Sequence, residues 1–210
     1  MPFTIENFSR VRPFLYHLTA KQNLARIQRT GRLDCAATLM RAAGDESLIT
    51  RKRRTAQVVT IAGEAVHIRD QSPLHEGNIT FENGWSFPQL IGDLNRRVFF
   101  WPGTPGSPIS YGIRHFERYR EEAPALLRLS YNELLESNPD AIPLFCKFNS
   151  GSPRCSSGRG SSRSSQTFVT AQDAGFTPSN VVEVTFLESV HLPQNVHVSD
   201  VPDGPWHQLA

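Results

Sequence analysis

The stretch Phe14-Leu15-Tyr16-His17-Leu18, with the residues that follow it to Gly31, decides how the rest of this sequence is interpreted. Its apolar and aromatic residues predict a short β-strand. Thr19 can cap a helix after that strand, and Gly31 is placed to end the helix. A histidine inside an apolar strand is most often a packed, hydrogen-bonded core residue, so His17 needs further support before any chemistry is assigned to it.

On both sides of this stretch, hydrophobic periodicity predicts short strands and helices along the whole chain. Strands are expected at residues 97–101, 125–129, 142–148, 181–186 and 196–198, and a β-hairpin at residues 56–61 and 65–69. Helices are expected at residues 87–94 and 111–120, with a helix or a pair of turns at residues 35–54. Residues 149–166, mostly Ser, Gly and Arg, are expected to form a flexible loop without packing residues. This order favours a single α+β domain over residues 1–210, with a split, mostly antiparallel sheet and flanking helices.

Length and composition exclude several classes of protein. The 210 residues, with 39% hydrophobic and 20% charged side chains, are typical of one globular domain and not of a disordered or coiled-coil chain. No run of 18 or more apolar residues is present and the N-terminus lacks a signal-peptide layout, so no membrane association is expected. Cys35, Cys146 and Cys155 fit no common zinc spacing, so no metal is expected, and a reduced cytoplasmic protein is the simplest interpretation.

The charged residues are unevenly distributed, although the net charge is only +2. Arg51-Lys52-Arg53-Arg54 is a run of cations, and the segment from Lys147 to Arg163 carries cations without any acid. Such runs allow contact with a polyanion such as nucleic acid, but solvated charge runs are equally common. Charge alone therefore leaves both interpretations open.

Glu183 is a second candidate for chemistry, because it lies between Val182 and Val184 in an expected strand. A carboxylate that faces the core without a partner is costly. Strand alternation also allows Glu183 to face solvent while its neighbours pack, and the pattern alone slightly favours that alternative.

Three segments together resemble the motifs of ADP-ribosyltransferases, in the branch of the poly(ADP-ribose) polymerases and diphtheria toxin. Residues 15–33 are similar to the first motif, an apolar strand that ends in a histidine and is followed by a helix. Residues 97–112 resemble the second motif, an aromatic strand followed by a small-residue turn and a tyrosine. Residues 180–186 are similar to the third, a late strand that carries the catalytic glutamate. The sequence also resembles an uncharacterised bacterial family.

The resemblance implies a fold of the ADP-ribosyltransferase type and NAD as co-substrate, with a role for each matching residue. His17 would hydrogen-bond the adenosine ribose, and Thr19 and Asn23 would help to hold the adenosine or diphosphate side. Tyr111 would stack on the nicotinamide ring. Glu183 would bind the 2′-hydroxyl of the nicotinamide ribose and stabilise the oxocarbenium-like sugar that forms when nicotinamide leaves.

The chain departs from the family pattern at one position of the donor pocket. Phe99 stands where the middle motif often has a strand tyrosine. This departure leaves room for Arg97 to act as a catalytic arginine, as in the bacterial toxins that modify DNA bases.

The expected acceptor is nucleic acid, DNA or RNA, and a protein or a small molecule stays open as an alternative. The basic loop before the catalytic strand would face it, with Arg154, Arg159 and Arg163 following phosphates, although these arginines can equally well only solubilise the loop. Two alternatives stay open: an RNA 2′-phosphotransferase, which would need phosphate-holding arginines beside the NAD pocket, and a non-catalytic domain that binds NAD, ADP-ribose or nucleic acid. Toxin, defence and repair roles are not distinguished, nor is an antitoxin or hydrolase partner.

Overall fold

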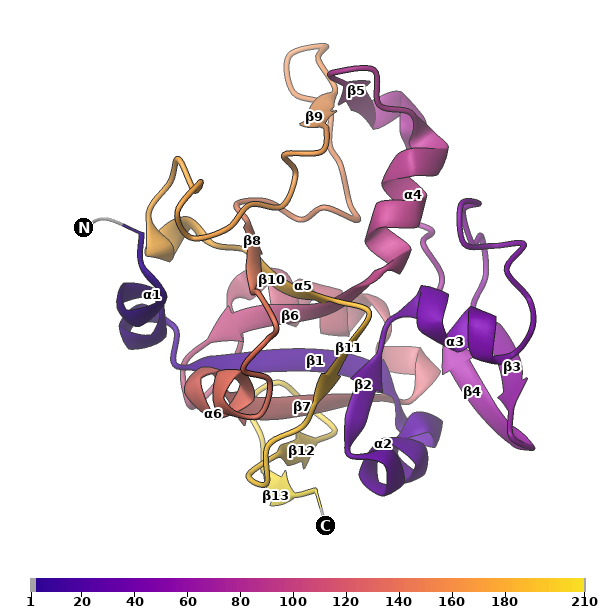
Figure 1. Cartoon of the computed structure of the whole chain (residues 1–210), viewed down its shortest axis with the longest axis vertical. Coiled ribbons are helices and arrows are strands. Elements are labelled where there is room, and N and C mark those ends of the chain that lie inside the picture. The colour runs from indigo at the N-terminus through magenta and orange to yellow at the C-terminus, as the bar shows by residue number, and fades with distance from the viewer. Residues whose placement is uncertain (1–2, 210) are drawn as a thin grey trace.

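A sheet of seven strands runs through the centre of the computed structural model, which describes residues 3–209 (Figure 1). In spatial order its strands are β13 (His207–Gln208), β12 (His197–Ser199), β7 (Pro124–Ser130), β1 (Phe14–Ala20), β6 (Arg97–Gly103), β10 (Glu183–Leu187) and β8 (Leu144–Cys146). Each pairing between neighbours in this sheet is antiparallel. The predicted α+β class with a mostly antiparallel sheet is confirmed.

Strand β6 divides this sheet into two halves. Its residues 101–103 pair with residues 14–16 of β1, whereas its residues 97–100 pair with residues 184–187 of β10. Strand β1 continues beyond its contact with β6 and pairs with β7 over its whole length. After Tyr16, the C-terminal end of β1 therefore separates from the N-terminal end of β6. Strand β6 is hydrogen-bonded to both halves of the sheet.

Short helices and three small two-stranded sheets surround the central sheet (Figure 1). The α-helices are α1 (Ile5–Val11), α2 (Leu24–Thr30), α3 (Ala36–Ala42), α4 (Phe87–Asn95), α5 (Ser110–Arg118) and α6 (Tyr131–Glu136). The 3-10 helices are η1 (Lys21–Asn23), η2 (Glu76–Asn78), η3 (Arg120–Glu122) and η4 (Pro178–Asn180). The small sheets are β2 (Arg32–Asp34) with β11 (Ser189–His191), β3 (Gln57–Ile61) with β4 (Glu64–Ile68), and β5 (Ile79–Phe81) with β9 (Ser161–Arg163).

The main core lies on one face of the central sheet, where alternate residues of each strand point. Val98 and Phe100 of β6 pack there beside Val184 and Phe186 of β10. The intervening residues of these strands, Arg97 and Phe99 in β6 and Glu183 in β10, therefore point to the opposite face. That face is the one on which the sequence placed its candidate chemistry.

Most of the predicted elements are confirmed, with small shifts at their ends. The hairpin is β3 and β4, the two expected helices are α4 and α5, and the expected strands are β1, β6, β7, β8, β10 and β12. Gly31 ends α2 in a left-handed conformation with φ of 59°, as its position predicts. Residues 35–54 form α3 and then turns.

The expectation that Thr19 caps a helix is wrong. Thr19 lies inside β1, and the chain enters 3-10 helix η1 after Ala20 without any side-chain cap. The strand extends two residues further than its apolar run because β7 supplies hydrogen-bonding partners as far as Ala20. Tertiary pairing thus overrides the local capping signal.

The expectation that residues 149–166 form a loop without packing residues is also wrong. Strand β9 within this segment pairs in parallel with β5, and Ser150, Arg163 and Ser164 are buried. A Cβ at Gly160 would lie 2.7 Å from the backbone of Ile79, so glycine permits the close approach of the two chains. Polar side chains do the packing here by hydrogen-bonding the backbone, which composition does not reveal.

Within residues 3–209, no helix combines the length and the apolar character needed to cross a membrane.

Candidate functional site

A cavity of about 1330 Å³ opens where β1 and β6 separate. Its lining includes most of the residues that the sequence singled out: His17, Thr19, Asn23, Arg97, Phe99, Tyr111, Arg154 and Glu183. They come from β1, η1, β6, α5, the loop after β8 and β10, so segments far apart in the sequence meet at one place. Arg159 and Arg163 do not line the cavity.

Glu183 is the buried carboxylate of this cavity. It is 3% exposed, and both of its carboxylate oxygens accept the backbone N–H of Ser150, each at 3.2 Å. Burial raises the pKa of Glu183 to about 7, against the lowering effects of the Ser150 hydrogen bond and of the Arg163 and Arg97 charges. Strand alternation left Glu183 facing either the packed core or solvent. In the structure it faces the cavity instead. We call Glu183, Ser150 and Phe148 the carboxylate wall.

Arg163 holds the carboxylate wall from behind. Its Nη1 donates to the Ser161 hydroxyl at 2.7 Å and the Ser162 carbonyl at 2.8 Å, and its Nη2 donates to the carbonyls of Asn149 and Ser150, each at 3.2 Å. Its guanidinium also lies 4.2 Å from the ring centroid of Phe148. The predicted acceptor-binding role of Arg163 is therefore wrong, because this side chain is 1% exposed and engaged with the backbone.

His17 bridges the gap between the two half-sheets. Its Nδ1 lies 2.9 Å from the carbonyl oxygen of Phe99, and since a carbonyl only accepts, Nδ1 carries the proton. Burial lowers the pKa of His17 to about 4, and the nearby charge of Arg69 contributes. The imidazole is thus neutral at pH 7 and offers Nε2 as an acceptor, which suits a hydroxyl donor on a ligand.

The amide of Asn23 is engaged in internal hydrogen bonds. Its Nδ2 donates to the His67 carbonyl at 2.9 Å and to the Thr19 hydroxyl at 3.2 Å, while its Oδ1 accepts the His67 N–H at 2.9 Å. The side chain therefore ties η1 to strand β4; Asn23 also lines the cavity, and its predicted contact with the donor stays a prediction. Thr19 borders the cavity beside it and keeps its own hydroxyl hydrogen for a ligand.

Arg97 likewise has internal partners for its guanidinium. Nε and Nη2 contact the two carboxylate oxygens of Asp93 at 3.2 and 2.7 Å, and Nη1 donates to the Thr185 hydroxyl at 3.3 Å. The group also lies 4.0 Å from the ring centroid of Phe168. Arg97 thus fixes α4 to β6 and β10, and the free cation expected of a catalytic arginine is not present at this position.

Two aromatic residues from the sequence analysis border the cavity at different depths. Phe99 is half-buried and packs edge-on against Phe168 at 6.0 Å between ring centroids. Tyr111, the second residue of α5, is 39% exposed, and the guanidinium of Arg114 lies 4.7 Å from its ring centroid. An exposed ring at the cavity edge is available to stack on a planar ligand.

Sequence reasoning missed a group of arginines that line the cavity. Arg69 follows strand β4, and Arg114 and Arg118 lie four residues apart on α5; we call these three residues the arginine wall. The spacing of Arg114 and Arg118 is a signal for a shared helix face that could have been read from the sequence. Nothing in the sequence pattern brings Arg69 to the same place.

His115 and Tyr119 stand beside the arginine wall. The His115 ring lies between those of Trp101 and Tyr119, at centroid distances of 5.4 and 5.1 Å. Burial lowers the pKa of His115 to about 3, with added effects from Arg69 and Arg118. The Tyr119 hydroxyl donates to the Asp70 carboxylate at 2.7 Å. Aromatic rings and a neutral imidazole thus form the floor of this end of the cavity.

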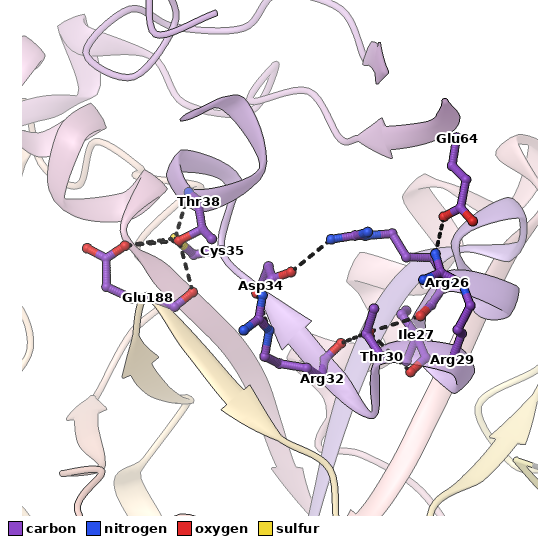
Figure 2. Close-up of polar contacts among 10 residues, drawn as sticks. All are labelled: Arg26, Ile27, Arg29, Thr30, Arg32, Asp34, Cys35, Thr38, Glu64 and Glu188. Atoms are coloured by element: carbon purple, nitrogen blue, oxygen red, sulfur yellow. Dashed lines mark hydrogen bonds and ion pairs between the residues drawn. The ribbon is translucent and has the colours of Figure 1, made fainter. Parts of the chain in front are cut away.

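The cations on α2 and β2, by contrast, are all paired with carboxylates (Figure 2). Asp34, which lines the cavity, contacts Arg26 at 3.3 Å and Arg32 at 2.8 Å. Arg29 contacts Glu64 at the end of the hairpin. These contacts tie α2, β2 and the hairpin together and leave no free charge there.

Glu188 makes a similar tie between α3 and the end of β10. Its carboxylate accepts from the Thr38 hydroxyl at 3.0 Å, from Arg41 at 3.1 Å and from Arg96 at 3.0 Å (the Thr38 contact is drawn in Figure 2). Within residues 3–209, no three His, Cys, Asp or Glu side chains are grouped so that they could hold a metal ion.

Comparison with known proteins gives a family but no activity. A family model described as "Family of unknown function (DUF7002)" matches residues 13–196, a range that contains every residue that lines the cavity. No curated protein and no solved structure matches the chain.

Proposed function

The chain belongs to the DUF7002 family of unknown function, and we propose that it binds NAD in this cavity and transfers ADP-ribose to an acceptor, with nucleic acid as the expected acceptor. One observation carries the proposal: His17 and Glu183, from opposite halves of a divided antiparallel sheet, line one cavity with Tyr111 at its edge. These residues match the three motifs of the resemblance in chain order. The divided sheet likewise supports the ADP-ribosyltransferase type of fold.

The dimensions and lining of the cavity suit a dinucleotide. Its volume of about 1330 Å³ exceeds the range of roughly 300–1,000 Å³ that is usual for small-molecule pockets. Neutral His17 would accept a hydrogen bond from a ribose hydroxyl, and the exposed ring of Tyr111 would stack on nicotinamide. Thr19 and Phe99 complete the donor side, whereas Asn23 supports it from behind.

Glu183 is placed to do the chemical work. Transfer breaks the bond between ribose C1′ and the nicotinamide nitrogen, and the electron pair leaves with neutral nicotinamide. The acceptor forms a new bond to C1′ and loses its proton. Positive charge develops on the sugar as the first bond breaks, and a buried carboxylate beside it stabilises that charge. Ser150 and Arg163 hold Glu183 in one orientation before substrate binds, so no reorganisation is needed at that moment.

The acceptor surface is smaller than the sequence predicts. Arg154 is exposed and lines the cavity, and Arg159 is exposed on the same loop. Because Arg163 is buried, two arginines of this loop are left to contact phosphates. Nucleic acid as the acceptor therefore rests on Arg154 and Arg159.

The proposal is tested by incubating the protein with NAD and measuring nicotinamide release, then searching DNA, RNA and protein for ADP-ribose by mass spectrometry. Glu183→Gln should reduce transfer by about 100-fold or more, the scale of removing a preorganised electrostatic group. Glu136→Gln, an exposed position on α6 outside the cavity, is the matched control and should be unaffected.

Other outcomes would replace the proposal with a rival. NAD binding without nicotinamide release would identify a non-catalytic binding domain. Release only in the presence of 2′-phosphorylated RNA would identify a 2′-phosphotransferase. Equal activity of wild type and Glu183→Gln would remove Glu183 from the chemistry.

A further inference from the structure

We propose that the arginine wall, Arg69, Arg114 and Arg118, forms a binding subsite for a phosphoryl group in this cavity. The inference deepens the proposed function because it names the charged part of the substrate that this end of the cavity holds. It rests on the entry of a phosphorylated ligand and not on transfer, so the two can be tested separately.

The first observation is that these arginines form no ion pair with a carboxylate of the described residues. The guanidinium groups of Arg69, Arg114 and Arg118 form no ion pair and no hydrogen bond with any residue from 3 to 209. Other arginines that line the cavity are committed: Arg97 is paired with Asp93, and Arg53 donates to Asn95 and to a backbone carbonyl. Arg154, on the loop after β8, also lines the cavity without such a partner, but it lies on the loop proposed to face the acceptor.

The second observation is the environment of Arg69. Its Nη1 atom is buried and has no hydrogen-bond partner. The guanidinium lies 4.4 Å from the ring centroid of Tyr119, whose hydroxyl is fixed by Asp70 at 2.7 Å. A buried, charged donor without an acceptor is costly, so the group is held ready for an acceptor that the protein itself does not supply.

The third observation is the effect of Arg69 and Arg118 on neighbouring histidines. The charge of Arg69 contributes to the low pKa of both His17 and His115, and Arg118 contributes to that of His115. The cations that act on Glu183 are different ones, Arg163 and Arg97. The cavity therefore has a positive part distinct from its carboxylate wall.

Acidic residues near the arginine wall form no close ion pair with it, although the charges of Asp70 and Glu122 act on Arg69. Asp70 is bound to Tyr119, and Glu117 is paired with Arg120 at 2.6 Å. Glu121 and Glu122 are exposed to solvent, which screens them. A dianionic group at this end of the cavity would find the partly buried Arg69 and the exposed Arg114 and Arg118 without an ion-pair partner.

Phosphoryl oxygens are the ligand that this arrangement fits best. A planar guanidinium group can donate two hydrogen bonds to one phosphate, and several guanidinium groups in the lining of one cavity favour a ligand with more than one negative charge. Two sources carry such a group here: the diphosphate of a dinucleotide donor, and a phosphate of a nucleic-acid acceptor.

The experiment measures binding by calorimetry with pyrophosphate, ADP and adenosine. The variants are Arg69→Gln and Arg118→Gln, with Arg120→Gln as the matched control, because Arg120 is exposed, paired with Glu117 and outside the cavity lining. Each of the first two should weaken pyrophosphate and ADP binding about tenfold or more, the scale of a lost charge-assisted hydrogen bond, and leave adenosine binding unchanged. Arg118 is exposed, so its variant is expected to fold even if that of Arg69 does not.

A second arm distinguishes the two sources. Dependence on these arginines for ADP assigns the subsite to the donor, and dependence only for a short 2′-phosphorylated RNA assigns it to the acceptor. Wild-type affinity for both ligands in both variants would overturn the subsite. Arginine-dependent pyrophosphate binding without nicotinamide release would support the subsite and contradict the transfer proposal. Nicotinamide release with unchanged KM for NAD and unchanged phosphate binding in both variants would support transfer and contradict the subsite.

Discussion

The carboxylate wall and the arginine wall of the cavity differ in how their charges are satisfied. Glu183 and the buried Arg163 behind it are bound to backbone groups of one short loop. In the arginine wall, Arg69 and Arg114 have aromatic neighbours, and none of the three arginines forms an ion pair with a described carboxylate. An internally satisfied charge is preorganised for chemistry or support, whereas an unsatisfied one is available to a ligand. Substitutions on either side of the cavity, and changes of pH, test this contrast.

The largest effect is expected from removing the support of the carboxylate wall. Arg163→Met leaves the carbonyls of Asn149, Ser150 and Ser162 without their donor, so the free energy of unfolding should fall by about 3 kcal/mol or more. Urea denaturation measures this, with Arg159→Met, an exposed position on the same loop, as the control. Equal stability of the two variants would show that Arg163 is not a support.

The next effect is the pH dependence that Glu183 imposes on stability. Its folded pKa is raised from 4.5 to about 7, so between these values the folded protein binds more protons than the unfolded chain. The free energy of unfolding should therefore fall as pH rises through this window, by at most about 3 kcal/mol. Glu183→Gln should lose this fall.

Transfer should show the opposite pH dependence, because the ionised carboxylate is the stabilising form. Activity is expected to rise through about pH 7 and to reach a plateau above it. Denaturation curves at several pH values, compared with a pH–rate profile, test both directions. A flat stability profile in wild type would contradict the buried environment of Glu183.

A smaller effect is expected at the loop that carries the remaining exposed cations. Replacing Arg154 and Arg159 together with alanine should reduce the slope of log affinity for nucleic acid against log salt by about 1.4–1.8 units, the sum of two phosphate contacts. NAD affinity should stay nearly constant because other residues form the donor side. Wild-type binding that is insensitive to salt would make a protein or small-molecule acceptor the better proposal.

The smallest effects are expected for the donor contacts between the two walls. His17→Ala and Tyr111→Ala should each weaken NAD binding by roughly 0.5–1.5 kcal/mol, through a lost hydrogen bond and lost stacking. Calorimetry checks this, with Val58→Ala, an exposed position on the hairpin, as the control. Unchanged affinity in both variants would place the donor elsewhere.

The sequence predicted the sheet better than the site, and the reason is physical. Apolar alternation located β6 and β10, because their core-facing residues must be apolar. Alternation defines a second face but not what covers it. For that reason it left the environment of Glu183 open between core and solvent, whereas the structure places it in a cavity.

The arginines show the same limit more clearly. Composition marked Arg163 as a surface cation because it stands among Ser and Gly, yet its partners are backbone carbonyls that no composition reveals. The sequence likewise assigns Arg97 to catalysis and Asn23 to the donor, because the pattern does not show that Arg97 pairs with Asp93 and that Asn23 donates to the His67 carbonyl. Arg69 carried no signal at all, since only the folded chain shows that its Nη1 lacks an acceptor.

The division of the central sheet at β6 has a mechanical consequence. In the described chain this strand is the only one hydrogen-bonded to both half-sheets, so a rotation of one half relative to the other must twist β6. The hydrogen bond from His17 of β1 to the Phe99 carbonyl of β6 connects the two strands where they separate. If every strand stays paired, the cavity can widen only if β6 twists and the hydrogen bond between His17 and the Phe99 carbonyl breaks. The width of the cavity at this point is therefore expected to depend on how easily β6 twists.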